Sequence, residues 1–312
     1  MGRSPQEVLT RMPDIIDLCF QGRSGVLGAA VVPADEGVAI VDPGPTSCLP
    51  ALEAGLKQRG LAMSDVRLLL LTHIHLDHAG ASGTIVRRSP RCRVVVHERG
   101  APHLIDPGKL LASASRLYGD VMDRLWGPFE PVPAEAVRIA RDGDSVAVKG
   151  PALLVRDTPG HAVHHVIYFD RAERVAYVGD TGGVCVKHGY VLAPTPPPDI
   201  DLDAWSLSLD RIQALNADRL LLTHFGVVTE PEVHLSQFRQ VLRKTAAMVR
   251  ETLEGPGDDG EKMRRFTEQL RTDVRRSLSE DDALATELAA PFDQLWLGLA
   301  RYWRKTAHPH VS

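Results

Sequence analysis

The chain has 312 residues, of which 44% are hydrophobic and 24% charged, and a formal net charge of −4. Because it contains no block of like charge and no basic tail, an electrostatic nucleic-acid binder is not indicated. No run approaches the roughly 18 uninterrupted apolar residues of a membrane span, and no secretory apolar core follows residues 1–6. We therefore expect a cytoplasmic globular enzyme without nucleic-acid or membrane partners.

Three short β-like runs open the chain, at residues 15–20, 26–32 and 38–41, and glycine and proline separate them. Tight turns of this kind favour antiparallel strands. Asp42 ends the third run. It either orients a metal-bound histidine through the second ring nitrogen or makes a turn before proline.

The strongest signal is an apolar run, residues 68–71, which is followed by His73, His75, Asp77 and His78. Neutral imidazoles and ionised carboxylates are the ligands of first-row divalent metals. The alternative is a polar loop that happens to be rich in histidine. With 13 histidines in the chain, chance gives this spacing on the order of once in a thousand such chains. The sequence therefore predicts a metal site at the end of a strand.

A β-α succession continues through a strand at residues 94–97 and interrupted helices at 98–125. Three large side chains, those of Tyr118, Met122 and Trp126, fall on one helical face. We interpret this face as core or pocket wall. His97 and His103 lack ligand spacing, so we interpret them as surface or packing residues; the alternative is that they line the pocket.

Three later apolar runs repeat the pattern of a strand followed by a polar residue beside glycine. Residues 153–157 precede His161, residues 175–178 precede Asp180, and residues 220–223 precede His224. Ligands at the same end of neighbouring strands can converge on one point. A carboxylate among glycines, such as Asp180, suits a bridge between two cations. His164 and His165 follow strand alternation and are interpreted as a structural pair.

The proline-rich loop at residues 193–201 is expected to rim the active site together with Tyr190; a rigid crossover is the alternative. Cys185 either reaches the pocket as a thiol or fills a small buried space.

Beyond residue 230 the pattern becomes helical and has little β signal, with a break at residues 255–260. We predict a catalytic domain over residues 1–229 and an all-helical extension over residues 230–312. The last helix is aromatic, with Trp296, Tyr302 and Trp303. It either covers the active site, packs on the core, or forms a homodimer interface.

From about residue 13 to 228 these motifs resemble the metallo-β-lactamase superfamily. The resemblance implies an α/β fold, an αββα sandwich of two mixed β-sheets flanked by helices, with a dinuclear metal site at one edge; the helical extension is appended to it. It implies that one ion binds to His73, His75 and His161. It implies that the other binds to Asp77, His78 and His224, with Asp180 bridging the two. Zinc is favoured by availability, and iron or manganese also suits these ligands.

The resemblance implies a hydrolase in which a metal-bridging hydroxide cleaves a small ester, thioester or lactone. Asp180 then bridges the metals and Asp77 also holds or receives a proton. The core motifs are similar to those of glyoxalase II and of lactone-hydrolysing members. The basic-aromatic, glycine-rich segment that binds glutathione in glyoxalase II is not found after Asp180, which disfavours glutathione thioesters.

Three alternatives remain. A phosphodiesterase or nuclease-type hydrolase is disfavoured because no large insertion lies between Asp180 and His224. A persulfide dioxygenase would use one iron on His73, His161 and Asp180, but His78 and His224 are both retained. A scaffold protein with vestigial metals is the least favoured, because the ligand set is complete.

Overall fold

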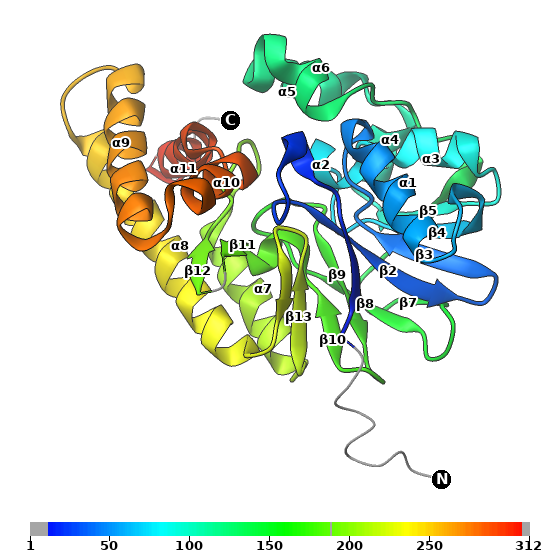
Figure 1. Ribbon diagram of the computed structural model, residues 1–312. Coiled ribbons are helices and arrows are strands. Elements are labelled where there is room, and N and C mark those ends of the chain that lie inside the picture. Colours follow the sequence, from blue (N-terminus) through cyan, green and yellow to red (C-terminus); the bar gives the residue numbers. More distant parts are fainter. Residues whose placement is uncertain (1–11, 188, 308–312) are drawn as a thin grey trace.

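The structure, a computed structural model, describes residues 12–187 and 189–307, so the predicted N-terminal feature at residues 1–6 lies outside the described part. Within it, two six-stranded sheets form the centre of the molecule, and helices lie on their outer sides (Figure 1). A separate two-stranded hairpin lies beside the C-terminal helices. None of the described helices is both long and apolar enough to cross a lipid bilayer.

The first sheet follows the order of the chain. It consists of β1 (Asp14–Asp17), β2 (Gly28–Ala34), β3 (Gly37–Val41), β4 (Val66–Leu70), β5 (Arg93–His97) and β6 (Val137–Ala140). The first three strands are antiparallel, as their tight turns predicted. Strands β3 to β6 are parallel, so their carboxyl ends lie at one edge.

The second sheet has the order β14-β13-β10-β9-β8-β7. Its strands are β7 (Ser145–Val146), β8 (Leu153–Asp157), β9 (Val166–Asp170), β10 (Val175–Tyr177), β13 (Arg219–Leu222) and β14 (Gly226–Val228). Strand β9 is antiparallel to both β8 and β10, and β10 is parallel to β13. Strands β8, β10 and β13 therefore point the same way, and their carboxyl ends share an edge.

The inner faces of the sheets meet in a dry layer. Leu70 and Val95 of the first sheet belong to the same buried cluster as Val155 and Leu221 of the second. Tyr168 crosses this layer, and its hydroxyl donates to the carbonyl of Leu71 at 2.9 Å. Because the inward residues alternate along each strand, burial fixes the register of both sheets. The predicted αββα sandwich is confirmed.

Helices fill the outer layers. The first sheet carries α1 (Leu49–Gln58), α2 (Leu76–Ala79), α3 (Ser82–Arg88) and α4 (Ala101–Ile105), and the second carries α7 (Leu202–Ala214). The segment after α4 forms α5 (Gly108–Tyr118) and α6 (Met122–Trp126), which lie above the sheets in Figure 1. The predicted single helical face is divided here, because a short turn from Gly119, with φ of 50°, separates the two helices.

The helical extension contains α8 (Pro231–Glu254), α9 (Asp259–Ser277), α10 (Glu280–Ala289) and α11 (Phe292–Ala307). It packs on its own chain: Trp296 and Trp303 of α11 donate hydrogen bonds to Thr252 and Ala246 of α8. Helix α11 also rests on the proline-rich loop, where the Thr195 hydroxyl donates to the carbonyl of Leu295 at 3.1 Å. A homodimer through these helices stays a prediction.

The contact between α11 and the proline-rich loop gives a stability prediction. A Cβ on Gly298 would lie 2.0 Å from the carbonyl oxygen of Thr195. Gly298→Ala should therefore lower the free energy of unfolding by about 1–3 kcal/mol, the usual cost of overpacking, as measured by urea denaturation. The control is Gly108→Ala, whose Cβ would make an ordinary 3.5 Å contact. Equal effects of the two substitutions would contradict the close packing of α11.

Candidate metal centre

The carboxyl ends of four strands bring the predicted ligands to one edge of the sandwich. His73 follows β4, His161 follows β8, Asp180 follows β10 and His224 follows β13. The turn after β10 needs Gly179, whose φ of +47° is unfavourable for other residues. A Cβ there would also lie 2.6 Å from the Thr72 hydroxyl. This turn thus sets Asp180 against the end of β4.

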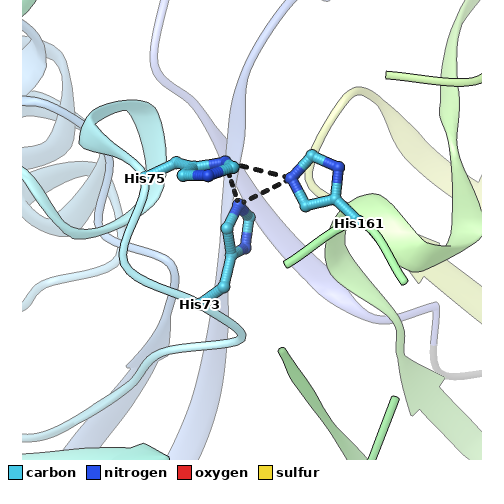
Figure 2. Close-up of side chains that lie close together, drawn as sticks. All are labelled: His73, His75 and His161. Carbon is cyan, nitrogen blue, oxygen red and sulfur yellow. Dashed lines mark hydrogen bonds between the residues drawn. The ribbon is translucent and has the colours of Figure 1, made fainter. Parts of the chain in front are cut away.

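Three histidines form the first group of potential ligands (Figure 2). The Nδ1 atom of His75 lies 3.0 Å from the Nε2 atoms of both His73 and His161, and these two lie 3.3 Å apart. Nitrogens about 2.0–2.1 Å from a tetrahedral zinc ion are separated by about 3.3 Å. The three nitrogens therefore have the spacing of ligands to one ion.

The second group combines Asp77, His78 and His224. The Asp77 Oδ2 atom lies 3.2 Å from the Nε2 atom of His224 and 3.8 Å from that of His78. Asp77 and His78 are carried by the single turn of α2, which begins directly after His75. The short helix therefore contributes two residues to the second group, whereas His73 and His75, which precede it, belong to the first.

Asp180 lies between the two groups. Its Oδ2 atom is 3.4 Å from the Nε2 atom of His161, and its Oδ1 atom is 3.1 Å from that of His78. Both Asp180 Oδ1 and His78 Nε2 are buried without a hydrogen-bond partner among the described residues. Buried polar atoms without partners are costly, and a cation between them would satisfy both. The seven side chains fit a pair of cations that share Asp180.

The protonation states favour metal binding. Burial, reinforced by neighbouring imidazoles, lowers the pKa of His73 well below its usual value, and burial lowers that of His161 to about 4. Burial alone would raise the pKa of Asp180, but His78 and His224 hold it well below its usual range. At neutral pH these two imidazoles are neutral and this carboxylate is ionised, the forms in which they bind metals.

His78 and His224 differ from the other histidines. Burial opposes their protonated forms, but the carboxylates of Asp180 and Asp77 raise the pKa of both rings above the usual value. A cation that binds to these rings must displace protons, so its binding here weakens as the pH falls.

Asp42 supports the centre from behind. Its fully buried carboxylate accepts hydrogen bonds from the Thr72 amide and hydroxyl and from the Thr223 hydroxyl, each at 2.8 Å. It also lies 2.8 Å from the Nδ1 atom of His78. Of the two roles expected for Asp42, orientation of a histidine is confirmed. One carboxylate therefore connects the ends of β3, β4 and β13.

Backbone carbonyls orient two more of the histidines. The Nδ1 atom of His161 lies 2.8 Å from the carbonyl oxygen of Pro194, and that of His224 lies 3.1 Å from the carbonyl oxygen of Val26. Each contact leaves the Nε2 atom directed at the cluster, as is usual for metal-bound histidine.

His165 is structural, as predicted. Its Nδ1 atom lies 2.8 Å from the Thr158 hydroxyl and 3.1 Å from the Thr181 hydroxyl. His164, its predicted structural partner, instead lines the cavity that is described below.

A cavity of about 490 Å³ opens onto the cluster. His75, Asp77, Asp180 and His224 lie at its metal-ligand end. Its walls come from α5 and α6, from the proline-rich loop, and from α10 and α11. The loop therefore rims the site as expected, and part of the helical extension covers it.

Two predicted pocket residues do not line this cavity. Cys185 lies in β11 (Val184–Lys187) and Tyr190 in β12 (Tyr190–Leu192), the hairpin that packs against α10 and α8. Cys185 is buried in the hydrophobic core, which corrects its proposed role as a pocket thiol. Tyr190 is half-buried and packs against the same core. The closeness of these residues to Asp180 in the sequence suggested a place in the pocket, but it could not reveal that the hairpin packs against α10 and α8.

Several cavity residues carry no recognisable signal in the sequence. Arg99, His103 and Lys109 all line the cavity; the sequence had singled out only His103, for which lining the pocket was the second interpretation. The three residues lie between the end of β5 and the first turn of α5. Only the path of this connection brings them beside the cluster.

Comparison with known proteins matches the sheet-containing part of the chain to a known family. A family model described as the metallo-beta-lactamase superfamily matches residues 21–224. A metallo-beta-lactamase fold-containing protein of Sulfurisphaera tokodaii is 26% identical over 67% of this chain and 78% of its own length. A hydroxyacylglutathione hydrolase of Aeromonas hydrophila is 28% identical over 64% of this chain. The match covers 65% of that enzyme, slightly under two thirds of its length.

Solved structures show the same architecture. A metallo-beta-lactamase family protein of Thermus thermophilus superposes with a TM-score of 0.65 over 90% of this chain and 89% of its own, at 23% identity. The protein TTHA1623, solved in a di-iron-bound form, is 27% identical with a TM-score of 0.51, over 65% of this chain and 89% of its own. The first likeness concerns the fold alone.

Proposed function

Because the chain belongs to the metallo-beta-lactamase superfamily, we propose that it is a hydrolase that uses two divalent cations to cleave a small ester, thioester or lactone. The observation that carries this proposal is the position of Asp180. Its two carboxylate oxygens face separate groups of ligands, His161 on one side and His78 on the other. A site with a single ion on His73, His75 and His161 would not explain why Asp77, His78 and His224 also form a group with ligand spacing.

The chemistry needs a strong nucleophile and a polarised bond. Two bound divalent cations supply Lewis acidity and lower the pKa of bound water toward about 7. Asp77 lines the cavity with 22% of its side chain exposed, so its carboxylate can receive the proton that the attacking water loses. The apolar helices around the cavity limit the access of bulk water.

The identity of the metal is proposed from the donor set. Five histidines and two aspartates, without a thiolate, suit zinc, iron or manganese. Zinc is proposed because it is the most available of these with such ligands. The di-iron-bound relative makes iron the main alternative.

Metal analysis together with a substrate screen tests the proposal. The purified protein should contain about two equivalents of metal per chain, and a chelator should abolish hydrolysis until metal is restored. The screen should include lactones, thioesters, carboxylate esters and phosphodiesters. One iron per chain with oxygen uptake on glutathione persulfide would instead support a dioxygenase, and turnover of phosphodiesters alone would support the nuclease-type alternative.

A further inference from the structure

One wall of the cavity is basic. Arg99 follows β5, His103 lies in α4, and Lys109 lies in the first turn of α5; together they are called the basic wall. All three line the same cavity as the metal ligands. Three basic side chains in an 11-residue stretch therefore face the space that the substrate must occupy.

The two permanent charges of this wall are not neutralised within the protein. Among the described residues, neither the Arg99 guanidinium nor the Lys109 ammonium makes an ion pair or a side-chain hydrogen bond. Arginines on the neighbouring helix α3 behave differently: Arg87 pairs with Glu130 at 2.7 Å and Arg88 with Glu53 at 2.6 Å. The basic wall thus retains its capacity to bind an anion.

Two carboxylates outside the metal cluster also line the cavity, but neither neutralises the basic wall. Glu287 is held by the guanidinium of Arg271, with contacts of 2.6 and 3.0 Å. Asp199 acts electrostatically on His75, at the metal end. Among the described residues, neither carboxylate makes an ion pair with Arg99 or Lys109. The positive charge of the basic wall is therefore not neutralised by the other groups that line the cavity.

Most other lining side chains are apolar. Helices α5 and α6 contribute Leu110, Leu117, Leu125 and Trp126, and Leu288 of α10 also lines the cavity. A cavity of this kind, mainly apolar with few polar groups, binds the body of a ligand by burial and fixes its orientation through the polar groups. A substrate that is polar throughout would gain nothing from burial against these apolar side chains.

We propose that the substrate is an ester or thioester with an apolar body and one anionic group, a carboxylate or phosphate, which the basic wall binds. This inference rests on the proposed hydrolytic function. Arg99 offers a planar fork that fits either oxyanion in a bidentate manner, and Lys109 adds a mobile point charge. Because the basic wall contains none of the potential metal ligands, we expect the contact to act on substrate binding and mainly to lower KM.

Four thioesters with the same acyl length test the inference. S-octanoyl-N-acetylcysteamine is neutral; S-octanoyl-mercaptopropionate and S-octanoyl-phosphopantetheine carry the anion on the thiol side; and suberyl-N-acetylcysteamine carries it on the acyl side. At least one anionic probe should show a KM about tenfold below that of the neutral probe, the effect of one good charge-assisted contact. The preferred probe identifies whether the anion is a carboxylate or a phosphate, and on which side it lies.

The paired variant Arg99→Ala with Lys109→Ala should remove this preference, measured as the ratio of kcat/KM for the anionic and neutral probes. Arg116→Ala is the matched control, because Arg116 is an exposed cation of the same helix, α5, outside the cavity lining. Equal KM values for all four probes in the wild-type protein, or equal loss of preference in the control, would overturn the inference alone. Failure of the metal-loaded protein to hydrolyse any ester, thioester or lactone would overturn the proposed function as well.

Discussion

Asp180→Asn should lower kcat/KM for any hydrolysed ester by about 10³-fold or more, because a metal-bridging carboxylate both holds the ions and balances their charge. The amide keeps the size of the side chain but loses the negative charge that faces His78 and His161. We expect the metal content to fall from about two equivalents per chain to about one or fewer.

Steady-state kinetics and metal analysis of the same preparation provide the measurement. Asp120→Asn is a suitable control, because Asp120 is exposed and its side chain makes no hydrogen bond or ion pair among the described residues. A variant that retains both the activity and the metal content of the wild-type protein would show that Asp180 is not a shared ligand. Thermal unfolding should show that Asp180→Asn still folds.

Asp42→Asn should lower the free energy of unfolding by about 3–5 kcal/mol, the usual cost of breaking a buried, fully hydrogen-bonded charge. The carboxylate accepts hydrogen bonds at both oxygens, and an amide nitrogen at either position would face a donor instead of accepting from it. Because His78 also loses its partner, metal affinity should fall about 10- to 100-fold.

Urea denaturation and a metal-competition titration would measure these two effects. Asp35→Asn is the control, since Asp35 is exposed and its side chain makes no hydrogen bond or ion pair among the described residues. The stability of this variant should stay within about 0.5 kcal/mol of wild type. If Asp42→Asn proved as stable as this control, Asp42 would not connect the strand ends as described.

The sequence predicted the convergence of the seven potential ligands, because each ligand is found in the sequence close to the end of an apolar strand. Each ligand follows an apolar run, and parallel strands place such residues at a common edge. The structure accordingly brings all seven side chains together, although their role as ligands stays a prediction until metal is measured. Asp42 was identified for the same reason, since it too ends a strand.

The substrate cavity could not be predicted, because its walls depend on packing between distant segments. Tyr118 of α5 and Gln294 of α11 meet at 3.3 Å although 176 positions separate them. The β11-β12 hairpin packs against α10 and α8 and not against the cavity, so the predicted pocket position of Tyr190 is wrong, and of the two roles expected for Cys185 the buried one is observed. The basic wall spans the turn after β5, the short helix α4 and the first turn of α5, and residue order carries little information about how such a connection packs.

The wall formed by Glu287 to Leu295 lies well beyond residue 224, where the family match ends. The metal-ligand end of the cavity and the basic wall lie inside the matched stretch, whereas this part of the cavity wall lies outside it. Substitutions in α10 and α11 are therefore expected to change the shape of the cavity without changing any of the seven potential ligands. Relatives that share only the matched stretch are for this reason incomplete guides to the shape of this cavity.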